Sequence, residues 1–160
     1  MAVRTKTQKS AIMSTLDCQP LEQLPVVSAQ PVEMKTYGTE NFKIEELEFL
    51  CKVPDDLLDN AQEVLENLQI LRNEIKRPIK IIPGGGYRDE KANAQCKGAK
   101  DSQHMQAKAS DIRVEGLTPT QVRDTIIKLI NAGKMKRGGV GLYSTFVHYD
   151  VRGSLVQWNG

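Results

Sequence analysis

The sequence is poor in several features that define particular protein classes. Its three cysteines, Cys18, Cys51 and Cys96, are an odd number without a CxxC spacing, so they indicate neither a disulfide framework nor a zinc ribbon. We interpret them as free thiols in a reducing compartment. The formal net charge is only +2, far from the concentrated basic field that nucleic-acid-binding proteins carry. Nucleic acid is therefore not an expected partner.

Long apolar runs are also missing from the chain. No stretch approaches the length of a membrane span, and the first thirty residues lack the continuous apolar segment of a secretory signal. We therefore expect no membrane partner and a protein that is cytoplasmic as synthesised. The remaining composition, 39% hydrophobic and 26% charged residues, is that of an ordinary globular protein.

The composition of the chain changes near residue 37. Residues 1–36 are rich in Gln, Ser, Thr, Pro and Val and show neither helical nor strand periodicity. We expect them to form a flexible tail, because they offer no apolar face that a fold could bury. An apolar pattern begins after Tyr37, which predicts one folded domain over residues 37–160.

A long amphipathic helix is the clearest element that the sequence predicts. Pro54 is followed by two aspartates, and both features are typical of a helix start. Apolar residues then recur along one stripe as far as Ile75, and Pro78 ends the pattern. The stripe consists of Leu57, Leu58, Ala61, Val64, Leu65, Leu68, Leu71 and Ile75.

The second half of the chain predicts short strands around one more helix. Thr118, Pro119 and Gln121 form the capping signature of a helix that continues to about Asn131. The predicted strands cover residues 79–82, 110–114, 139–143, 146–151 and 155–158, and the last three suggest an antiparallel meander. This order predicts an α+β domain with helices packed on one face of an antiparallel sheet.

The chain contains only two histidines, His104 and His148, so their surroundings are informative. Asp111 begins a predicted strand beside apolar residues, where an acid is costly unless it is paired or bound to a metal. A catalytic zinc site typically has three imidazole or carboxylate ligands and one open position, and these three residues would satisfy it. From spacing alone, a structural histidine held by hydrogen bonds remains the alternative.

Three ordered motifs resemble the zinc D-alanyl-D-alanine carboxypeptidase-like peptidases, a group that includes murein endopeptidases and phage endolysins. SQHMQAKASDIRV is similar to the family's Ser-x-His-x-x-Gly-x-Ala-x-Asp motif. GGYRDEKAN is similar to its Ser-Gly-Tyr-Arg segment with the trailing Asn, and GGVGLYSTFVHYDVRG to its C-terminal ligand segment. The likeness covers residues 42–160 and implies a hedgehog/D-Ala-D-Ala-peptidase-like fold.

The resemblance also implies roles for individual residues. His104, Asp111 and His148 match the three zinc ligands, which implies one zinc ion per chain. Arg88 matches the arginine that holds a substrate carboxylate, and Ser102 matches the motif serine beside bound substrate. Without the resemblance, Arg88 would be interpreted as a member of a surface ion pair.

The sequence departs from the family pattern at three positions. Ala107 replaces the motif glycine, a small change as long as the backbone there does not need positive φ. Gly85 replaces the usual serine, and Thr145 stands where many members carry an acidic general base. The nearest remaining acid is Asp150, in a His-x-Asp arrangement that resembles the branch ending in HxDxR. We predict that Asp150 acts as the general base or orients the zinc water, with a supporting structural role as the alternative.

The resemblance implies zinc-dependent hydrolysis of peptidoglycan stem or cross-link peptides, by a D,D-carboxypeptidase or a murein endopeptidase of the endolysin type. A phage-encoded protein released to the cell wall would fit the missing signal segment. A catalytically inactive, zinc-stabilised binding or structural module of the same fold is the alternative, consistent with Gly85 and Thr145. An α+β scaffold without metal is a third interpretation.

Overall fold

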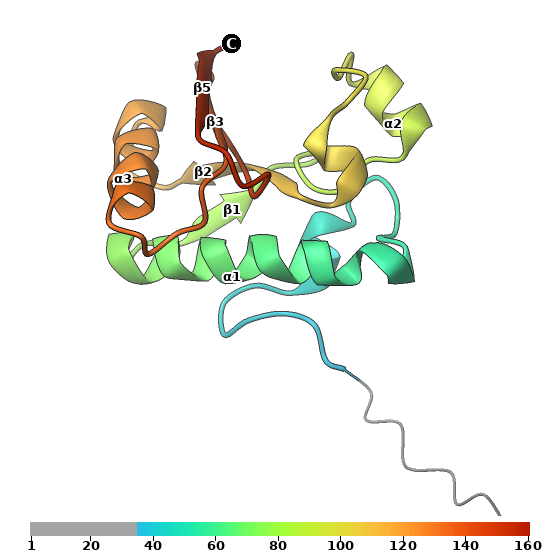
Figure 1. The fold of residues 1–160 in the computed structure, drawn as a ribbon, viewed down its shortest axis with the longest axis horizontal. Helices are drawn as coiled ribbons and strands as arrows, with labels where there is room; N and C mark the ends of the chain where they lie inside the picture. The colour runs from blue at the N-terminus through green and yellow to red at the C-terminus, as the bar shows by residue number, and fades with distance from the viewer. Residues whose placement is uncertain (1–34) are drawn as a thin grey trace, which may run out of the picture. The chain divides into compact units, whose positions relative to one another are not determined.

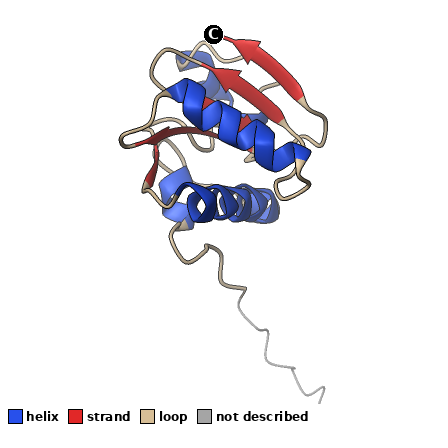
Figure 2. Cartoon of the chain, turned by 90° about the vertical axis from the view of Figure 1, so that its left-hand side faces the viewer, coloured by secondary structure: helices blue, strands red, loops and turns tan. Residues whose placement is uncertain are grey.

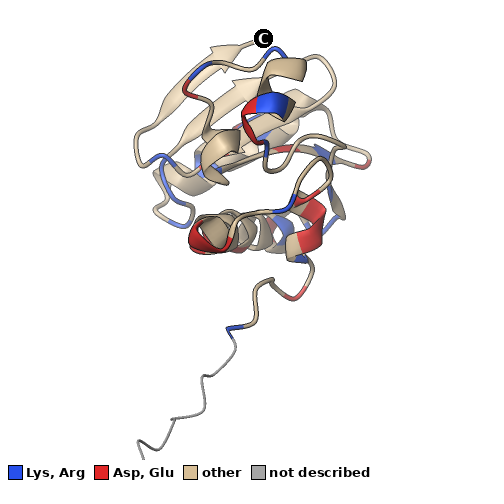
Figure 3. Ribbon diagram, turned by 90° about the vertical axis from the view of Figure 1, so that its right-hand side faces the viewer, with Lys and Arg blue, Asp and Glu red and all other residues tan. Residues whose placement is uncertain are grey.

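The computed structural model describes residues 35–160, so most of the predicted tail lies outside the described residues. Within the described part, helices and strands alternate in a mixed α+β arrangement, which confirms the predicted fold class. No helix in this part is long and apolar enough to cross a membrane. Lys, Arg, Asp and Glu are interspersed on the side that Figure 3 shows.

The described residues form one sheet of five strands in the order β1-β2-β4-β3-β5. The first four strands pair antiparallel, whereas β5 pairs parallel with β3. The prediction of a purely antiparallel sheet was therefore wrong. Both edges of β4 are already paired, with β2 and with β3, so the chain that follows β4 adds β5 to the free edge of β3. Strand β5 runs opposite to β4 and therefore parallel to β3. The strands are β1 (Ile79–Ile81), β2 (Ala109–Val114), β3 (Gly139–Leu142), β4 (Val147–Asp150) and β5 (Val156–Asn159).

The two predicted helices form at the positions that their sequence signals indicate. Helix α1 (Leu58–Ile75) follows a short 3-10 turn, and α3 (Pro119–Asn131) begins with the predicted capping box. The Thr118 N–H donates to Gln121 Oε1 at 2.9 Å, and the Gln121 N–H donates to Thr118 Oγ1 at 3.3 Å. A third helix, α2 (Glu90–Gln95), was not predicted because six residues are too few for a periodic signal.

The main core lies between the sheet and the two longer helices. Figure 1 shows α1 along the lower side and α3 on the opposite side of the strands from α2, and Figure 2 shows α3 across the strands. Strand alternation separates the two faces of the sheet. The strand side chains that join the helix-covered core are Ile79, Ile112, Val114, Val140, Val147 and Tyr149. Asp111, His148 and Asp150 occupy the alternate positions, so the polar site lies on the other face.

A glycine turn after β1 connects the core to the polar face. The Asp111 N–H donates to the Gly85 carbonyl at 2.7 Å, and the Tyr87 N–H donates to the Leu47 carbonyl at 2.8 Å. A Cβ at Gly86 would lie 2.2 Å from the Leu47 oxygen, and one at Gly85 would lie 2.8 Å from Asp111 Cβ. The close approach of the Leu47 backbone therefore explains the glycine at position 86, and Asp111 limits the space at position 85.

This packing predicts that Gly86→Ala is costly. The added methyl group must displace the backbone of Leu47, so we expect a loss of about 3 kcal/mol in the free energy of unfolding. Gly133→Ala is the matched control: Gly133 has a φ of +69° but no atom within 4 Å of its would-be Cβ. It should cost only about 1 kcal/mol of backbone strain. Equal losses in urea denaturation would contradict the packing argument.

Candidate metal centre

Three separate elements bring the predicted ligands together. His104 lies in a 3-10 turn (Gln103–Gln106), Asp111 on β2 and His148 on β4. Asp111 and His148 are paired across the two strands. Ala107 turns the chain from His104 into β2 with a φ of +51°. The backbone at Ala107 therefore does need a positive φ, contrary to the condition under which replacing the motif glycine is a small change. The Cβ of Ala107 destabilises this conformation by about 1 kcal/mol relative to glycine.

The polar atoms of these three side chains converge in a buried space. His148 Nδ1 lies 2.9 Å from Asp111 Oδ1 and 3.2 Å from His104 Nε2. His104 Nε2 lies 3.4 Å from the same carboxylate oxygen. One possible ligand atom from each residue falls within 4.8 Å of the others, and all three residues are buried. The geometry is that of a cluster able to hold one metal ion.

The outer contacts of the two histidines determine which nitrogen carries a proton. His104 Nδ1 lies 2.7 Å from the Gly86 carbonyl, and His148 Nε2 lies 3.1 Å from Asp150 Oδ2. Both oxygens can only accept, so both outer nitrogens are N–H donors. In the neutral imidazoles, the inner nitrogens are lone-pair acceptors that face each other and Asp111. Such a set of acceptors needs a positive charge at its centre.

The pKa shifts reflect this need. Burial would raise the pKa of Asp111, but hydrogen bonds from His104 and His148 hold it well below its usual value. Burial would lower the pKa of His148, yet its contacts with Asp111 and Asp150 raise it above normal. Both shifts show that the site favours a positive charge among these atoms. A metal ion bound there would require the imidazole nitrogens that face it to be unprotonated.

Asp150 lies behind His148 and is completely buried. Its Oδ1 accepts from the Gly139 N–H at 2.8 Å, and Arg152 donates to both carboxylate oxygens, with the shortest contact at 2.6 Å. These donors and His148 outweigh the effect of burial and keep the pKa of Asp150 below its usual value. The carboxylate is thus ionised and fully occupied with hydrogen bonds.

Arg88 lies behind Asp111 in a similar way. Its Nη2 donates to Asp111 Oδ2 at 2.8 Å, and its Nε donates to the Gly84 carbonyl at 2.7 Å. The side chain is 12% exposed. Arg88 therefore orients a candidate ligand, a role that the sequence did not indicate, and it still borders the open cavity.

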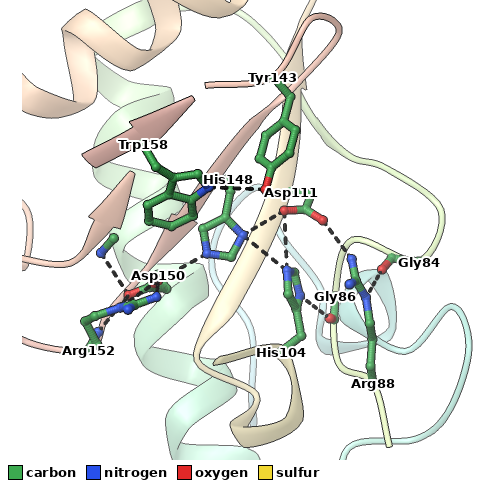
Figure 4. Close-up of polar contacts among 11 residues, drawn as sticks. Gly84, Gly86, Arg88, His104, Asp111, Tyr143, His148, Asp150, Arg152 and Trp158 are labelled. Carbon is green, nitrogen blue, oxygen red and sulfur yellow. Dashed lines mark hydrogen bonds and ion pairs between the residues drawn. The ribbon is translucent and has the colours of Figure 1, made fainter. Parts of the chain in front are cut away.

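A cavity of about 500 Å³ opens over the cluster. Ser102 lines this cavity and directly precedes the 3-10 turn that carries His104. Figure 4 shows Tyr143 and Trp158 on the His148 side and Arg88 beyond His104. Thr145 is exposed and accepts a hydrogen bond from Arg113 at 3.0 Å. It does not belong to the described residues that line this cavity.

Sequence reasoning missed several residues that shape the site. Gly86 contributes through its carbonyl and Gly139 through its N–H, and backbone groups leave no signal in side-chain patterns. Tyr143 and Trp158 carry weak signals, since aromatic residues are rare and Trp158 is the chain's single tryptophan. Arg152 belongs to the HxDxR pattern, but only the structure reveals its contact with Asp150.

Comparison with known proteins places these observations in a family. A family model described as Peptidase M15 matches residues 40–150, which include all three candidate ligands. A protein from Haemophilus influenzae named probable peptidoglycan L,D-endopeptidase MepK is 37% identical over 116 residues, 68% of this chain and 55% of that protein. The peptidoglycan L,D-endopeptidase MepK of Escherichia coli K12 is 34% identical over 83 residues, 48% of this chain and 41% of that protein. The chain spans about half the length of these curated relatives. Because the family model covers well over half of its residues, the chain belongs to the peptidase M15 family.

Proposed function

We propose that this chain is a zinc-dependent endopeptidase that hydrolyses peptide bonds in peptidoglycan. Membership of the peptidase M15 family supports the reaction class, and the names of two relatives, both peptidoglycan L,D-endopeptidases, support the substrate. The observation that carries the proposal is the convergence of three buried acceptors beneath an open cavity, with both histidine N–H groups directed away from it. The endopeptidase names favour internal cleavage over trimming of a terminal residue.

The donor set fits zinc better than the common hard cations. Two imidazole nitrogens and one carboxylate oxygen are a familiar three-ligand zinc set with a fourth position open. Magnesium and calcium prefer oxygen ligands throughout. His104, Asp111 and His148 would hold the ion. Zinc bound there would supply Lewis-acid activation of water and polarisation of a substrate carbonyl.

The surrounding residues would prepare the site by fixing its geometry. The Gly86 carbonyl holds His104 in one tautomer, and Arg88 directs the Asp111 carboxylate toward the histidines. Arg88 Nη1 makes no hydrogen bond within residues 35–160, which leaves N–H groups for a substrate carboxylate. Ser102 lines the cavity, where its hydroxyl would contact a bound peptide.

The contacts of Asp150 favour an orienting role over a general-base role. A base must reach the water that it deprotonates, whereas Asp150 is fully buried and both of its oxygens accept hydrogen bonds. Its Oδ2 accepts from His148 Nε2 and so directs Nδ1 into the cluster. Such outer partners of metal-binding histidines raise the basicity of the ligand and fix its orientation.

We predict one zinc ion per chain in the purified protein. His104→Ala and His148→Ala should each remove it, because two remaining ligands hold zinc weakly. Cys96→Ala is the control, since Cys96 borders the cavity but lies outside the cluster, and it should retain zinc.

Elemental analysis measures the occupancy, and chelation should lower the melting temperature of the wild type. Full occupancy in both histidine variants would refute the site, and zinc without hydrolysis of any cell-wall peptide would favour the non-catalytic module.

Asp150→Asn distinguishes the two roles considered for this residue. If Asp150 orients His148, the variant should bind zinc about ten- to a hundredfold more weakly, and excess zinc should restore the hydrolysis rate. Asp101→Asn is the matched control: Asp101 borders the cavity but makes no hydrogen bond to the cluster within the described residues. Its zinc affinity should be unchanged. A rate that stays low in Asp150→Asn when zinc is fully bound would instead assign Asp150 a chemical step.

A further inference from the structure

The candidate ligands lie between two arginines. A chain of contacts runs from Arg88 through Asp111, His148 and Asp150 to Arg152. Figure 4 shows Arg88 and Arg152 on opposite sides of the histidine pair. Both arginines border the 500 Å³ cavity. The metal centre therefore has a cationic side chain at each end.

Arg152 has more donors than Asp150 uses. Its Nε and Nη2 donate to Asp150, while Nη1 makes no hydrogen bond within the described residues. A guanidinium carries five N–H groups in a planar fork, so the Nη1 pair and one Nη2 hydrogen remain. The Arg152 side chain is 33% exposed. Asp150 also accepts hydrogen bonds from His148 and from two backbone N–H groups, so Arg152 is one of several donors that stabilise the Asp150 carboxylate.

A row of residues across the sheet places an aromatic wall beside Arg152. Asp111, His148, Gly141 and Trp158 are consecutive partners across β2, β4, β3 and β5. A Cβ at Gly141 would lie 2.6 Å from the Trp158 indole, so glycine lets the ring lean over β3. The indole centroid reaches 5.1 Å from that of His148, and the Arg152 guanidinium lies 5.7 Å over the indole.

The wall extends beyond Trp158 and is fixed by its own contacts. Trp158 Nε1 donates to the Tyr143 hydroxyl at 3.2 Å, and the Tyr143 ring stacks on Phe146 with 4.4 Å between centroids. All three aromatic residues border the cavity. They offer a rigid apolar surface for an aliphatic chain, with a cation at its edge.

The charges around the cavity favour an anionic ligand. The basic residues Arg88, Lys97 and Arg152 are balanced by Asp101 and Asp111, which line the cavity, and by Asp150 behind it. A divalent ion among the ligands would then leave a net positive charge. Positive clefts with low-dielectric walls attract anionic ligands, and arginine binds carboxylates in a bidentate manner.

We propose that Arg152 and Trp158 form a subsite for a substrate carboxylate, on the opposite side of the metal centre from Arg88. Arg152 binds the carboxylate with its outer fork, and Trp158 packs against the aliphatic chain that carries it. This inference rests on the proposed peptidase function and deepens it. It specifies peptides that carry free carboxylates on both sides of the scissile bond. Arg152 and Trp158 both lie just after the residues 40–150 that the family model matches.

The single tryptophan gives a direct readout of this subsite. We would titrate the zinc-loaded 160-residue chain with a synthetic peptidoglycan cross-link peptide and follow Trp158 fluorescence in the rapid binding phase. Copies of the peptide would have each free carboxylate converted in turn to an amide. Amidation of the carboxylate that Arg152 binds should weaken binding to the wild type by about tenfold or more, because a charge-assisted pair is lost. Arg152→Gln should bind that amide and the parent peptide equally.

Two further variants complete the test. Arg152→Lys keeps a cation beside Asp150 but lacks the planar fork, so it should hold zinc and still lose most of the discrimination. Arg123→Gln is the matched control, because Arg123 pairs with Asp124 on α3 away from the cavity, and it should discriminate as the wild type does.

The subsite would be overturned if both Arg152 variants still discriminated against every amide that the wild type binds weakly, or if the wild type bound every peptide equally. Hydrolysis without this discrimination would reject the subsite and leave the proposed function standing. Discrimination without hydrolysis would do the reverse.

Discussion

Three buried hydrogen-bond acceptors that face one another are unstable unless a positive charge lies between them. His104 Nε2, His148 Nδ1 and Asp111 Oδ1 form such a set. The histidines cannot avoid this by moving a proton from the outer to the inner ring nitrogen, because the outer nitrogens donate their N–H groups to the Gly86 carbonyl and to Asp150. The site can hold either a proton or a cation. This single requirement links the tautomers, the raised pKa of His148 and the proposed zinc site.

The fold satisfies this requirement by using both faces of one sheet. Cross-strand pairing places Asp111 beside His148, while the neighbouring residues Ile112 and Tyr149 point into the opposite, helix-covered core. Tyr149 is fixed there, since its hydroxyl donates to the Lys136 carbonyl at 2.7 Å. Packing of the core therefore fixes the two strands that carry Asp111 and His148. The same row continues to Trp158, which connects the metal centre to the proposed carboxylate subsite.

The sequence predicted what depends on local pattern and missed what depends on distant partners. Helix α3 begins at Pro119 as expected, because its capping signals lie within four residues. The three candidate ligands came from motif order, which a linear sequence preserves. The parallel pairing of β5 follows from a tertiary constraint, whereas the left-handed conformation of Ala107 ends the 3-10 turn that carries His104. The contacts of Asp150 are also tertiary, since the Gly139 N–H that occupies it belongs to another strand.

X-ray absorption at the zinc edge of the metal-loaded protein tests the central claim most directly. The account predicts two imidazole rings and only nitrogen or oxygen ligands, at about 2.0–2.2 Å from the metal. Cys96 borders the same cavity, so a thiolate is the realistic competitor. A sulfur ligand at about 2.3 Å, or a signal from fewer than two imidazoles, would contradict the claim that His104, Asp111 and His148 hold the ion.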